Sequence, residues 1–470
     1  MEIISLPFLI FALAIILVYS RLSRPAQNAW LLAASYIFYL SWGWYYAIVL
    51  LVMTLINYTL GLRLEQDSSS HSKWLWAGIL LNGGALIALK ALSSAYGILI
   101  FNALNWTREQ PNWTAVLLPI GFSFYTLQAI SYLIDVSRGQ IAPVRNPIDF
   151  ALYLAYFPKL LSGPIEKAGR FIPQLEHERK VDNLQIGRGL GLILVGLLRK
   201  LVIADALTAI RPADIFSNPM GYSTLERLVW LVVFAFTLYN DFAGYTAIVR
   251  GLSALLGIEL SPNFAQPFFA RSFSEFWSRW HISLSVWLRD YIFFPLRRWI
   301  LQKRLPAWMA LTVPPLLTML VSGYWHRASI SMLFWGGLHG LYQVLEQKFW
   351  KRRPSESVLR QILSAFVIFI FVTLAWIPFA AGDFSATLVY FRGFLPPYQS
   401  SFPTTAWLNI AAALLFSLGL DWQEFQAGSD VYFLNWPARI QTWAVFATLL
   451  VLILFAGGGP DISNFVYQGF

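Results

Sequence analysis

The chain contains no cysteine, and this absence excludes several kinds of chemistry at once. Disulfide bonds, thiolate nucleophiles and cysteine-ligated metal sites are ruled out for all 470 residues. Charged residues are also scarce, at 12% of the chain, whereas a soluble domain carries about 25%. The chain therefore lacks the polar surface that a soluble protein of this length needs.

Three common catalytic signatures are missing from the sequence as well. There is no phosphate-binding G-x-x-x-x-G-K-[ST] loop and no zinc-binding H-E-x-x-H helix. No serine lies in a G-x-S-x-G turn, which is where α/β-hydrolases hold their nucleophile. Any catalysis must therefore use other side chains, and we expect neither a bound metal nor a bound cofactor.

What the chain does contain is apolar sequence, which makes up 57% of its residues. Apolar stretches long enough to cross a bilayer recur along it, and each crossing needs roughly 20 residues. The first stretch, Ile3 to Tyr19, has no basic segment before it, so it is expected to remain as a membrane helix and not to be cleaved. The pattern predicts an all-α integral membrane protein, a single polytopic domain over residues 1–470 with about eleven or twelve membrane segments.

The net charge of +10 is best explained by membrane topology. Basic residues concentrate in the loops at 63–73, 297–304 and 348–353, which the positive-inside rule places in the cytosol. The loop at 105–114 is then expected outside. This distribution accounts for the charge without a nucleic-acid partner, and we expect membrane lipid as the surrounding phase.

Two apolar segments, Met309–Tyr324 and Ser329–Leu345, are predicted to form a hairpin with the sequence YWHRA at its tip. His326 lies at this tip among apolar residues, where ionisable side chains are costly and often functional. A structural histidine bonded to a backbone carbonyl is one interpretation, and a general base is the other. His339 lies 13 residues further on, on a different side of a helix, so it is expected to be a packing residue.

A second histidine, His281, lies in the segment SRWHISLSVWLRDYIF at 278–293. If this segment is one helix, His281, Ser285 and Arg289 share a polar stripe, because they are four residues apart. Glu275 and Arg279 have the same spacing and are expected to pair. The stripe indicates either an amphipathic helix lying in the cytosolic interface or a binding site for a donor substrate.

Several motifs together resemble the membrane-bound O-acyltransferases, and more narrowly the bacterial branch that modifies alginate and teichoic acid. The core of the resemblance spans about residues 115–345. Its motifs are LPIGFSFYTLQAISYLIDVSRG at 118–139, FPKLLSGPI at 157–165, LYNDFAGY at 238–245, NFAQPF at 263–268, FWSRWHISLSVWLRDYIFFPL at 276–296 and YWHRASISMLFWGGLHG at 324–340.

The resemblance implies a many-helix fold around a central tunnel, with His326 as the catalytic residue and His281 as its partner lining the tunnel. Substrate binding is expected at the residues Ser285, Arg289, Trp325, Arg327 and Asp241. Arg327 stands where the family usually has glycine, and it either favours the neutral imidazole of His326 or binds an anionic group on the acceptor.

The implied activity is transfer of a small acyl group, most simply acetyl, from a cytosolic thioester donor to a hydroxyl group. The donor is acetyl coenzyme A or an acyl carrier protein. The acceptor is an exported polysaccharide, reached directly or through an extracytoplasmic partner protein. The expected location is the bacterial cytoplasmic membrane, and a non-catalytic transporter or scaffold of an envelope complex is the alternative.

Overall fold

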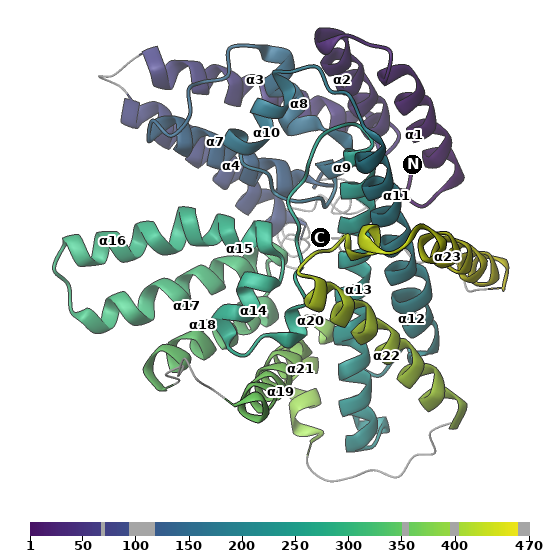
Figure 1. Ribbon diagram of the computed structural model, residues 1–470. Helices are drawn as coiled ribbons and strands as arrows, with labels where there is room; N and C mark the ends of the chain where they lie inside the picture. Colours follow the sequence, from purple (N-terminus) through teal and green to yellow (C-terminus); the bar gives the residue numbers. More distant parts are fainter. Residues whose placement is uncertain (67–70, 94–117, 350–356, 395–403, 459–470) are drawn as a thin grey trace, which may run out of the picture. The chain divides into compact units, whose positions relative to one another are not determined.

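In the computed structural model the described residues are 1–66, 71–93, 118–349, 357–394 and 404–458, and within these ranges every regular element is a helix (Figure 1). The described chain forms two compact units. The first unit contains residues 1–193 and 248–261, and the second contains residues 194–247 and 262–458. Helices α11 and α13 each contribute residues to both units. The all-α prediction is thus confirmed for the described residues.

The first unit is built around helices whose apolar residues are only partly covered by protein. In α1, the side chains of Phe8, Ala12, Ile15 and Tyr19 are buried, whereas its other faces expose leucine and isoleucine. Exposed apolar faces of this kind are suited to contact with lipid. The helices of this unit are α1 (Leu6–Tyr19), α2 (Arg24–Leu40), α3 (Trp44–Gln66), α4 (His71–Leu92), α7 (Phe122–Ser137), α8 (Pro147–Ala155), α9 (Phe157–Leu160), α10 (Ala168–Phe171), η1 (Ile172–Leu175) and the start of α11 (Asn183–Leu197).

Buried polar side chains in the first unit have specific partners. Arg24 and Asn28 on α2 both donate to the carboxylate of Asp149 on α8, at 2.5 and 2.7 Å. The ammonium of Lys159, which lies in the FPKLLSGPI motif, is fully buried between the rings of Tyr153 and Phe171, 5.0 Å from each centroid. These contacts satisfy polar groups that would otherwise be costly to bury, and they give Lys159 of this motif a structural role.

The second unit holds all the residues predicted to act in catalysis. Its elements are η2, a π-helix (Leu198–Asp205), α12 (Ala206–Ile210), η3 (Pro219–Gly221), α13 (Thr224–Ala254), η4 (Pro267–Phe269), α14 (Phe273–Arg279), α15 (Ile282–Leu288), η5, a second π-helix (Arg289–Phe293), α16 (Phe294–Gln302), α17 (Ala307–His326), α18 (Ile330–Phe349), α19 (Val358–Ala375), α20 (Ile377–Ala381), α21 (Phe384–Arg392), α22 (Thr404–Ala427), η6 (Tyr432–Asn435) and α23 (Ala438–Gly458).

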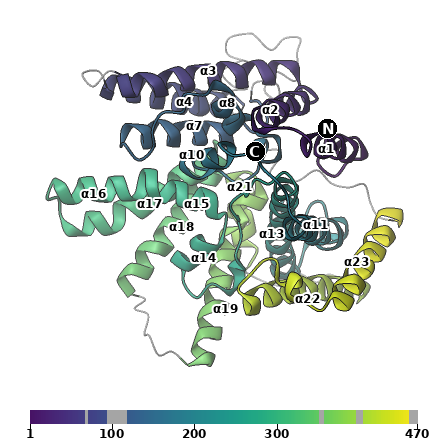
Figure 2. The same ribbon diagram turned by 45° about the horizontal axis from the view of Figure 1, so that its top comes forward.

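The predicted hairpin is confirmed as helices α17 and α18, which lie side by side in both ribbon views (Figure 2). Glycines allow the close approach of the two backbones. A methyl group at Gly323 would overlap the carbonyl oxygen of Met332, and one at Gly336 would overlap that of Met319. Small residues at such crossings are typical of helix pairs in membranes.

Five helical stretches are long and apolar enough to cross a membrane, within the part of the chain that the structure describes. The predicted number of eleven or twelve segments is not confirmed, and the loop at 105–114 lies outside the described residues. The apolar segment at 150–161 is divided between α8 and α9. The candidate spans are Trp44–Glu65, Ser72–Leu92, Thr224–Ala254, Ala307–His326 and Val358–Ala381, and the shorter apolar helices are Leu6–Tyr19 and Ala438–Ile453.

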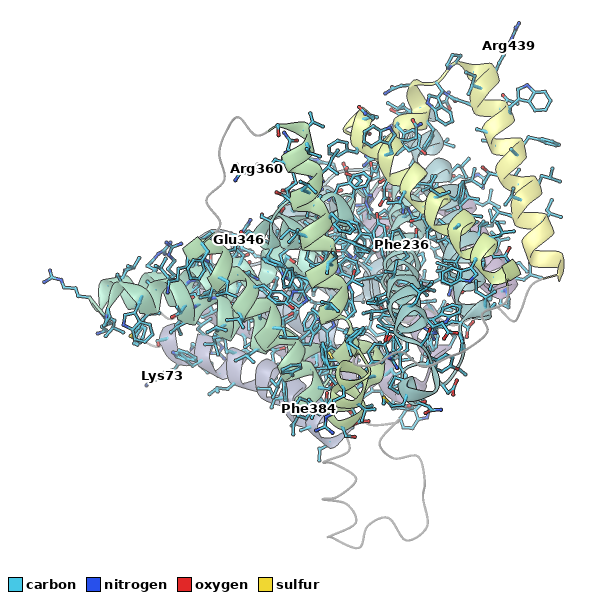
Figure 3. All side chains as sticks on the ribbon, turned by 90° about the horizontal axis from the view of Figure 1, so that it is seen from below. Lys73, Phe236, Glu346, Arg360, Phe384 and Arg439 are labelled. Atoms are coloured by element: carbon cyan, nitrogen blue, oxygen red, sulfur yellow. The ribbon has the colours of Figure 1, made fainter. Side chains whose placement is uncertain are left out.

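The second unit has a dense interior of side chains around α13. Figure 3 shows Phe236 on this helix surrounded by other side chains, whereas Arg439 projects from the end of α23. Phe236 is 4% exposed, and its ring lies 4.9 Å from that of Phe268. Phe242, on the same helix, lies 4.8 Å from the ring of His281, so this interior positions the segment that carries His281.

Candidate active site

His326 is the last residue of α17 and is 3% exposed. Three aromatic rings surround its imidazole, with centroid distances of 4.9 Å to Trp325, 5.3 Å to Trp335 and 5.7 Å to Phe379. These rings come from α17, α18 and α20, so the hairpin and the helix that follows it build the pocket together. A base enclosed by rings is shielded from bulk water, which suits a reaction that must avoid hydrolysis.

Arg327 follows directly and ends α17 in an extended conformation. Its side chain is half-buried, and one guanidinium nitrogen donates a long bond of 3.5 Å to the carbonyl of Phe379. The Nε atom is buried and makes no hydrogen bond to any described residue. Phe379 thus contacts both His326 and Arg327, which places the guanidinium beside the imidazole pocket.

His281 lies in a break between two helices and not within one continuous helix, so the prediction of a single helix over 278–293 is wrong. Helix α14 ends at Arg279, and His281 has a left-handed backbone with φ of 42° before α15 begins. The break exists because Asn263 binds the start of α15. Its backbone carbonyl accepts from the Ile282 N–H at 2.9 Å, and its side-chain oxygen accepts from the Ser283 hydroxyl at 2.6 Å.

The imidazole of His281 is fully buried. Its ring lies 4.8 Å from Phe242 and 6.1 Å from Trp325. Burial lowers the pKa of His281 to about 3, so the side chain is neutral at physiological pH. Because Trp325 also contacts His326, one indole ring contacts both His281 and His326.

A cavity of about 460 Å³ opens beside the segment that follows His281. Ser285 and Arg289 both line it, whereas His281, the third residue of the predicted stripe, is not among the lining residues. The Ser285 hydroxyl donates to the Trp280 carbonyl at 3.0 Å, and Arg289 pairs with the neighbouring Asp290 at 2.8 Å. The lining is mainly apolar and includes Trp277, Ile282, Phe293, Thr318 and Met319.

Asp241, predicted to bind substrate, contacts a buried lysine. Its carboxylate lies 2.9 Å from the ammonium of Lys200, which also pairs with Asp205 at 2.8 Å. Lys200 lies in the π-helix η2, whose wider turn is a local irregularity often found at functional sites. Gly244, in the same LYNDFAGY motif, lets α13 approach the end of α11 and the start of η2, because a methyl group there would lie 2.7 Å from the carbonyl oxygen of Gly196 and 3.1 Å from the backbone nitrogen of Lys200.

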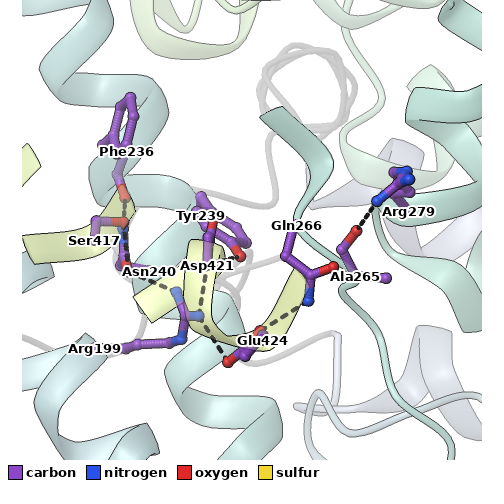
Figure 4. A network of polar contacts seen from close by, with 10 residues as sticks. All are labelled: Arg199, Phe236, Tyr239, Asn240, Ala265, Gln266, Arg279, Ser417, Asp421 and Glu424. Atoms are coloured by element: carbon purple, nitrogen blue, oxygen red, sulfur yellow. Dashed lines mark hydrogen bonds and ion pairs between the residues drawn. The ribbon is translucent and has the colours of Figure 1, made fainter. Parts of the chain in front are cut away.

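The neighbouring residue Arg199 forms a second buried cluster with α22 (Figure 4). It pairs with Asp421 at 2.7 Å and with Glu424 at 3.0 Å, and it bonds the side-chain oxygen of Asn240 on α13 at 3.1 Å. The hydroxyl of Tyr239 donates to Asp421 at 2.8 Å. We call this set the Arg199 network.

Three residues that shape the surroundings of His281 were not predicted from the sequence: Asn263, Gln266 and Glu424. The first two lie in the NFAQPF motif, where Gln266 has a left-handed backbone with φ of 48°. Gln266 donates to Glu424 at 2.9 Å. Non-glycine residues with positive φ are uncommon, but a sequence pattern does not reveal them.

His339 is fully buried on α18, and neither ring nitrogen forms a hydrogen bond with the described chain. Its ring contacts Trp335 at 4.9 Å and Trp277 at 5.1 Å. Glu275 and Arg279 pair at 2.9 Å, so that prediction is confirmed. Within the described ranges, no three or more side chains of the types that bind metal ions gather as a potential site.

Comparisons with known proteins identify the family of the chain. The model of the membrane-bound O-acyltransferase family matches residues 135–377, a range that contains His281 and His326. The chain is 34% identical to a probable alginate O-acetylase of Azotobacter vinelandii, over 76% of this chain and 70% of the relative. It is 30% identical to a probable alginate O-acetylase of Pseudomonas putida, over 94% of each chain.

A third relative is a peptidoglycan O-acetyltransferase of Helicobacter pylori. It is 28% identical, over 77% of this chain and 73% of the relative. The family match covers more than half of the chain, and relatives at 30% identity or more share most of its length. The chain therefore belongs to the membrane-bound O-acyltransferase family, in the branch of the alginate and peptidoglycan O-acetyltransferases, and is an acyltransferase.

Proposed function

We propose that this protein transfers an acetyl group from a cytosolic thioester donor to a hydroxyl group on an exported polysaccharide, or on an extracytoplasmic partner that carries the group onward. The observation that carries the proposal is His326, a buried imidazole at the tip of a helical hairpin, enclosed by three aromatic rings. The names of the relatives, which are O-acetylases of alginate and peptidoglycan, support acetyl as the group. The membrane would be the bacterial cytoplasmic membrane.

In the proposed reaction His326 acts as a general base. Its neutral imidazole takes the proton of the acceptor hydroxyl while the oxygen bonds to the thioester carbonyl carbon. The C–S bond then breaks, and the departing sulfur takes the proton from the imidazolium. The products are an ester and a free thiol, and the histidine returns to its neutral form.

The cavity beside Ser285 and Arg289 is the proposed donor site. Its volume of about 460 Å³ is in the range of small-molecule pockets. Apolar walls suit the acyl arm of a thioester, and Arg289, with 53% of its side chain exposed, can meet a phosphate at the mouth. Trp325 contacts both histidines and would hold the acyl group between them.

Replacing His326 tests the catalytic assignment. We expect His326→Ala to reduce turnover by at least a thousandfold, because loss of a general base removes the proton acceptor. The assay is thiol release from S-acetyl phosphopantetheine, the arm that coenzyme A and carrier proteins share, with a polysaccharide acceptor present. The chain has no cysteine, so a thiol reagent reports only the product.

His326→Gln serves as the second variant, because it preserves size and hydrogen bonding but is not a base near neutral pH. Both variants must elute as folded protein in detergent at the wild-type position. Turnover above a tenth of the wild-type rate in either variant would contradict the role of His326. Ester formation without thiol release would contradict the thioester donor.

We propose that Arg327 contacts an anionic group on the acceptor, since its guanidinium lies beside the His326 pocket and pairs with no carboxylate of the described chain. Arg327→Gly should raise KM about tenfold for a uronate-bearing oligosaccharide, the effect of losing one charged hydrogen bond. KM for a neutral oligosaccharide should stay unchanged. An equal change for both acceptors would contradict binding of an anionic group.

A further inference from the structure

The loop that carries the NFAQPF motif forms a short backbone clasp with the segment around His281. The Ala265 N–H donates to the carbonyl of Arg279 at 3.0 Å, and the Ile282 N–H donates to the carbonyl of Asn263 at 2.9 Å. The Arg279 guanidinium returns a bond of 3.0 Å to the Ala265 carbonyl. These contacts hold both sides of the break in which His281 lies.

Each of the two segments joined by these bonds contains a residue with a left-handed backbone. Gln266 has φ of 48° and His281 has φ of 42°, and in the described chain the only other non-glycine residue with positive φ is Arg304. Such conformations cost about 1 kcal/mol or more and persist only where the surrounding structure imposes them. The contacts that hold Gln266 in place are therefore relevant to His281.

The contact that fixes the Gln266 side chain comes from α22. Glu424 accepts from the Gln266 amide at 2.9 Å through one carboxylate oxygen, and its other oxygen pairs with Arg199 at 3.0 Å (Figure 4). The ring of Phe425 lies 6.0 Å from the guanidinium carbon of Arg279. Helix α22 thus contacts both segments of the clasp, at Gln266 and at Arg279. It lies outside residues 135–377, which match the family model.

We propose that Glu424 is a positioning residue for His281. Through Gln266 it holds the loop at 263–267 against the break, and the loop fixes the left-handed backbone that turns the imidazole inward. Arg199 orients Glu424 through their ion pair at 3.0 Å, which holds the other carboxylate oxygen toward Gln266. The proposal rests on the donor site proposed beside Ser285 and Arg289, and it assigns His281 to donor binding because His281 lies four residues before Ser285, which lines that cavity.

If this is correct, removing the Glu424 side chain should weaken donor binding in the same way as removing the imidazole. We expect Glu424→Ala and Gln266→Gly each to raise KM for S-acetyl phosphopantetheine about tenfold, as for one hydrogen bond to a charged group. Glycine at 266 accepts the positive φ, so that variant removes only the side-chain contact. Glu424→Gln keeps an acceptor oxygen and should recover most of the loss.

Asp421→Asn is the matched control. Asp421 lies one helical turn from Glu424 and binds the same Arg199, but none of its hydrogen bonds goes to Gln266. This variant should lower stability and leave KM within twofold of the wild-type value. Combining Glu424→Ala with His281→Ala should give no further increase in KM over His281→Ala, since one residue acts through the other.

A labelling experiment separates this proposal from the donor role of His281. Ser278 lines the cavity and is exposed, and the chain has no native cysteine, so Ser278→Cys gives a single reporter. Glu424→Ala should speed its reaction with a maleimide severalfold, and Asp421→Asn should not. Unchanged labelling would overturn the positioning role, whereas faster labelling with unchanged KM in both Glu424→Ala and His281→Ala would refute the donor role instead.

Discussion

Two parts of the second unit's interior use buried polar residues in opposite ways. Around Arg199 and Lys200, each cation meets two carboxylates at 2.7 to 3.0 Å, and hydroxyl and amide groups complete the contacts. Around His326 and His339 the neighbours are aromatic rings, chiefly Trp335, at centroid distances near 5 Å.

The difference distinguishes charged residues that have a structural role from the residues proposed to act in catalysis. A buried charge is tolerated only when it is paired and hydrogen-bonded, and the ion pairs and hydrogen bonds of the Arg199 network hold its side chains in place. The histidines of the aromatic region lie among the uncharged rings of tryptophan and phenylalanine, and an imidazole is a group that can accept a proton near neutral pH. The proposed proton transfer therefore lies in the aromatic region, at His326.

Among the substitutions considered, the largest loss of stability is expected at Arg199. Arg199→Met would leave two buried carboxylates without their cation, so we expect the free energy of unfolding to fall by about 3–5 kcal/mol. Equilibrium unfolding in mixed detergent micelles measures this change. Arg439→Met, at an exposed arginine on α23, is the control and should change the value by less than about 0.5 kcal/mol. A loss below 1 kcal/mol at Arg199 would show that the network does not stabilise the unit.

A smaller effect is expected at Asp241, where the partner cation keeps a second carboxylate. In Asp241→Asn, Lys200 retains Asp205 and the new amide oxygen can still accept a hydrogen bond, so a loss of about 1–2 kcal/mol is expected. Donor and acceptor KM should not change if Asp241 is purely structural. A change of more than threefold in either KM would show that Asp241 takes part in substrate binding.

The smallest change in the free energy of unfolding is expected at His339, whose ring nitrogens make no hydrogen bond to the described chain. His339→Leu conserves volume and removes no polar partner, so the free energy of unfolding should change by less than about 1.5 kcal/mol. Thiol release should remain near the wild-type rate. A well-folded His339→Leu protein without activity would show that the aromatic region contains a second essential histidine.

The sequence alone predicted the helical class, the α17–α18 hairpin and the position of His326 at its tip. These succeeded because apolar stretches, basic flanks and a single polar tip are local properties of the chain. The pairing of Glu275 with Arg279 was predictable for the same reason, since four residues make one helical turn. The number of membrane segments was not, because length and hydropathy alone cannot tell a short oblique helix from a crossing.

The tertiary structure decided what the residues around His281 do. The sequence pattern over 278–293 is compatible with one helix. In the structure, however, Asn263 accepts hydrogen bonds from the first residues of α15, and the helix is interrupted at His281. Lys200 and Glu424 find their partners across 41 and 158 residues of sequence, in Asp241 and Gln266. Periodicity records which face of a helix is apolar, but the partner of a buried charge or a strained backbone is set by packing between segments distant in the chain, and only the folded structure brings those segments together.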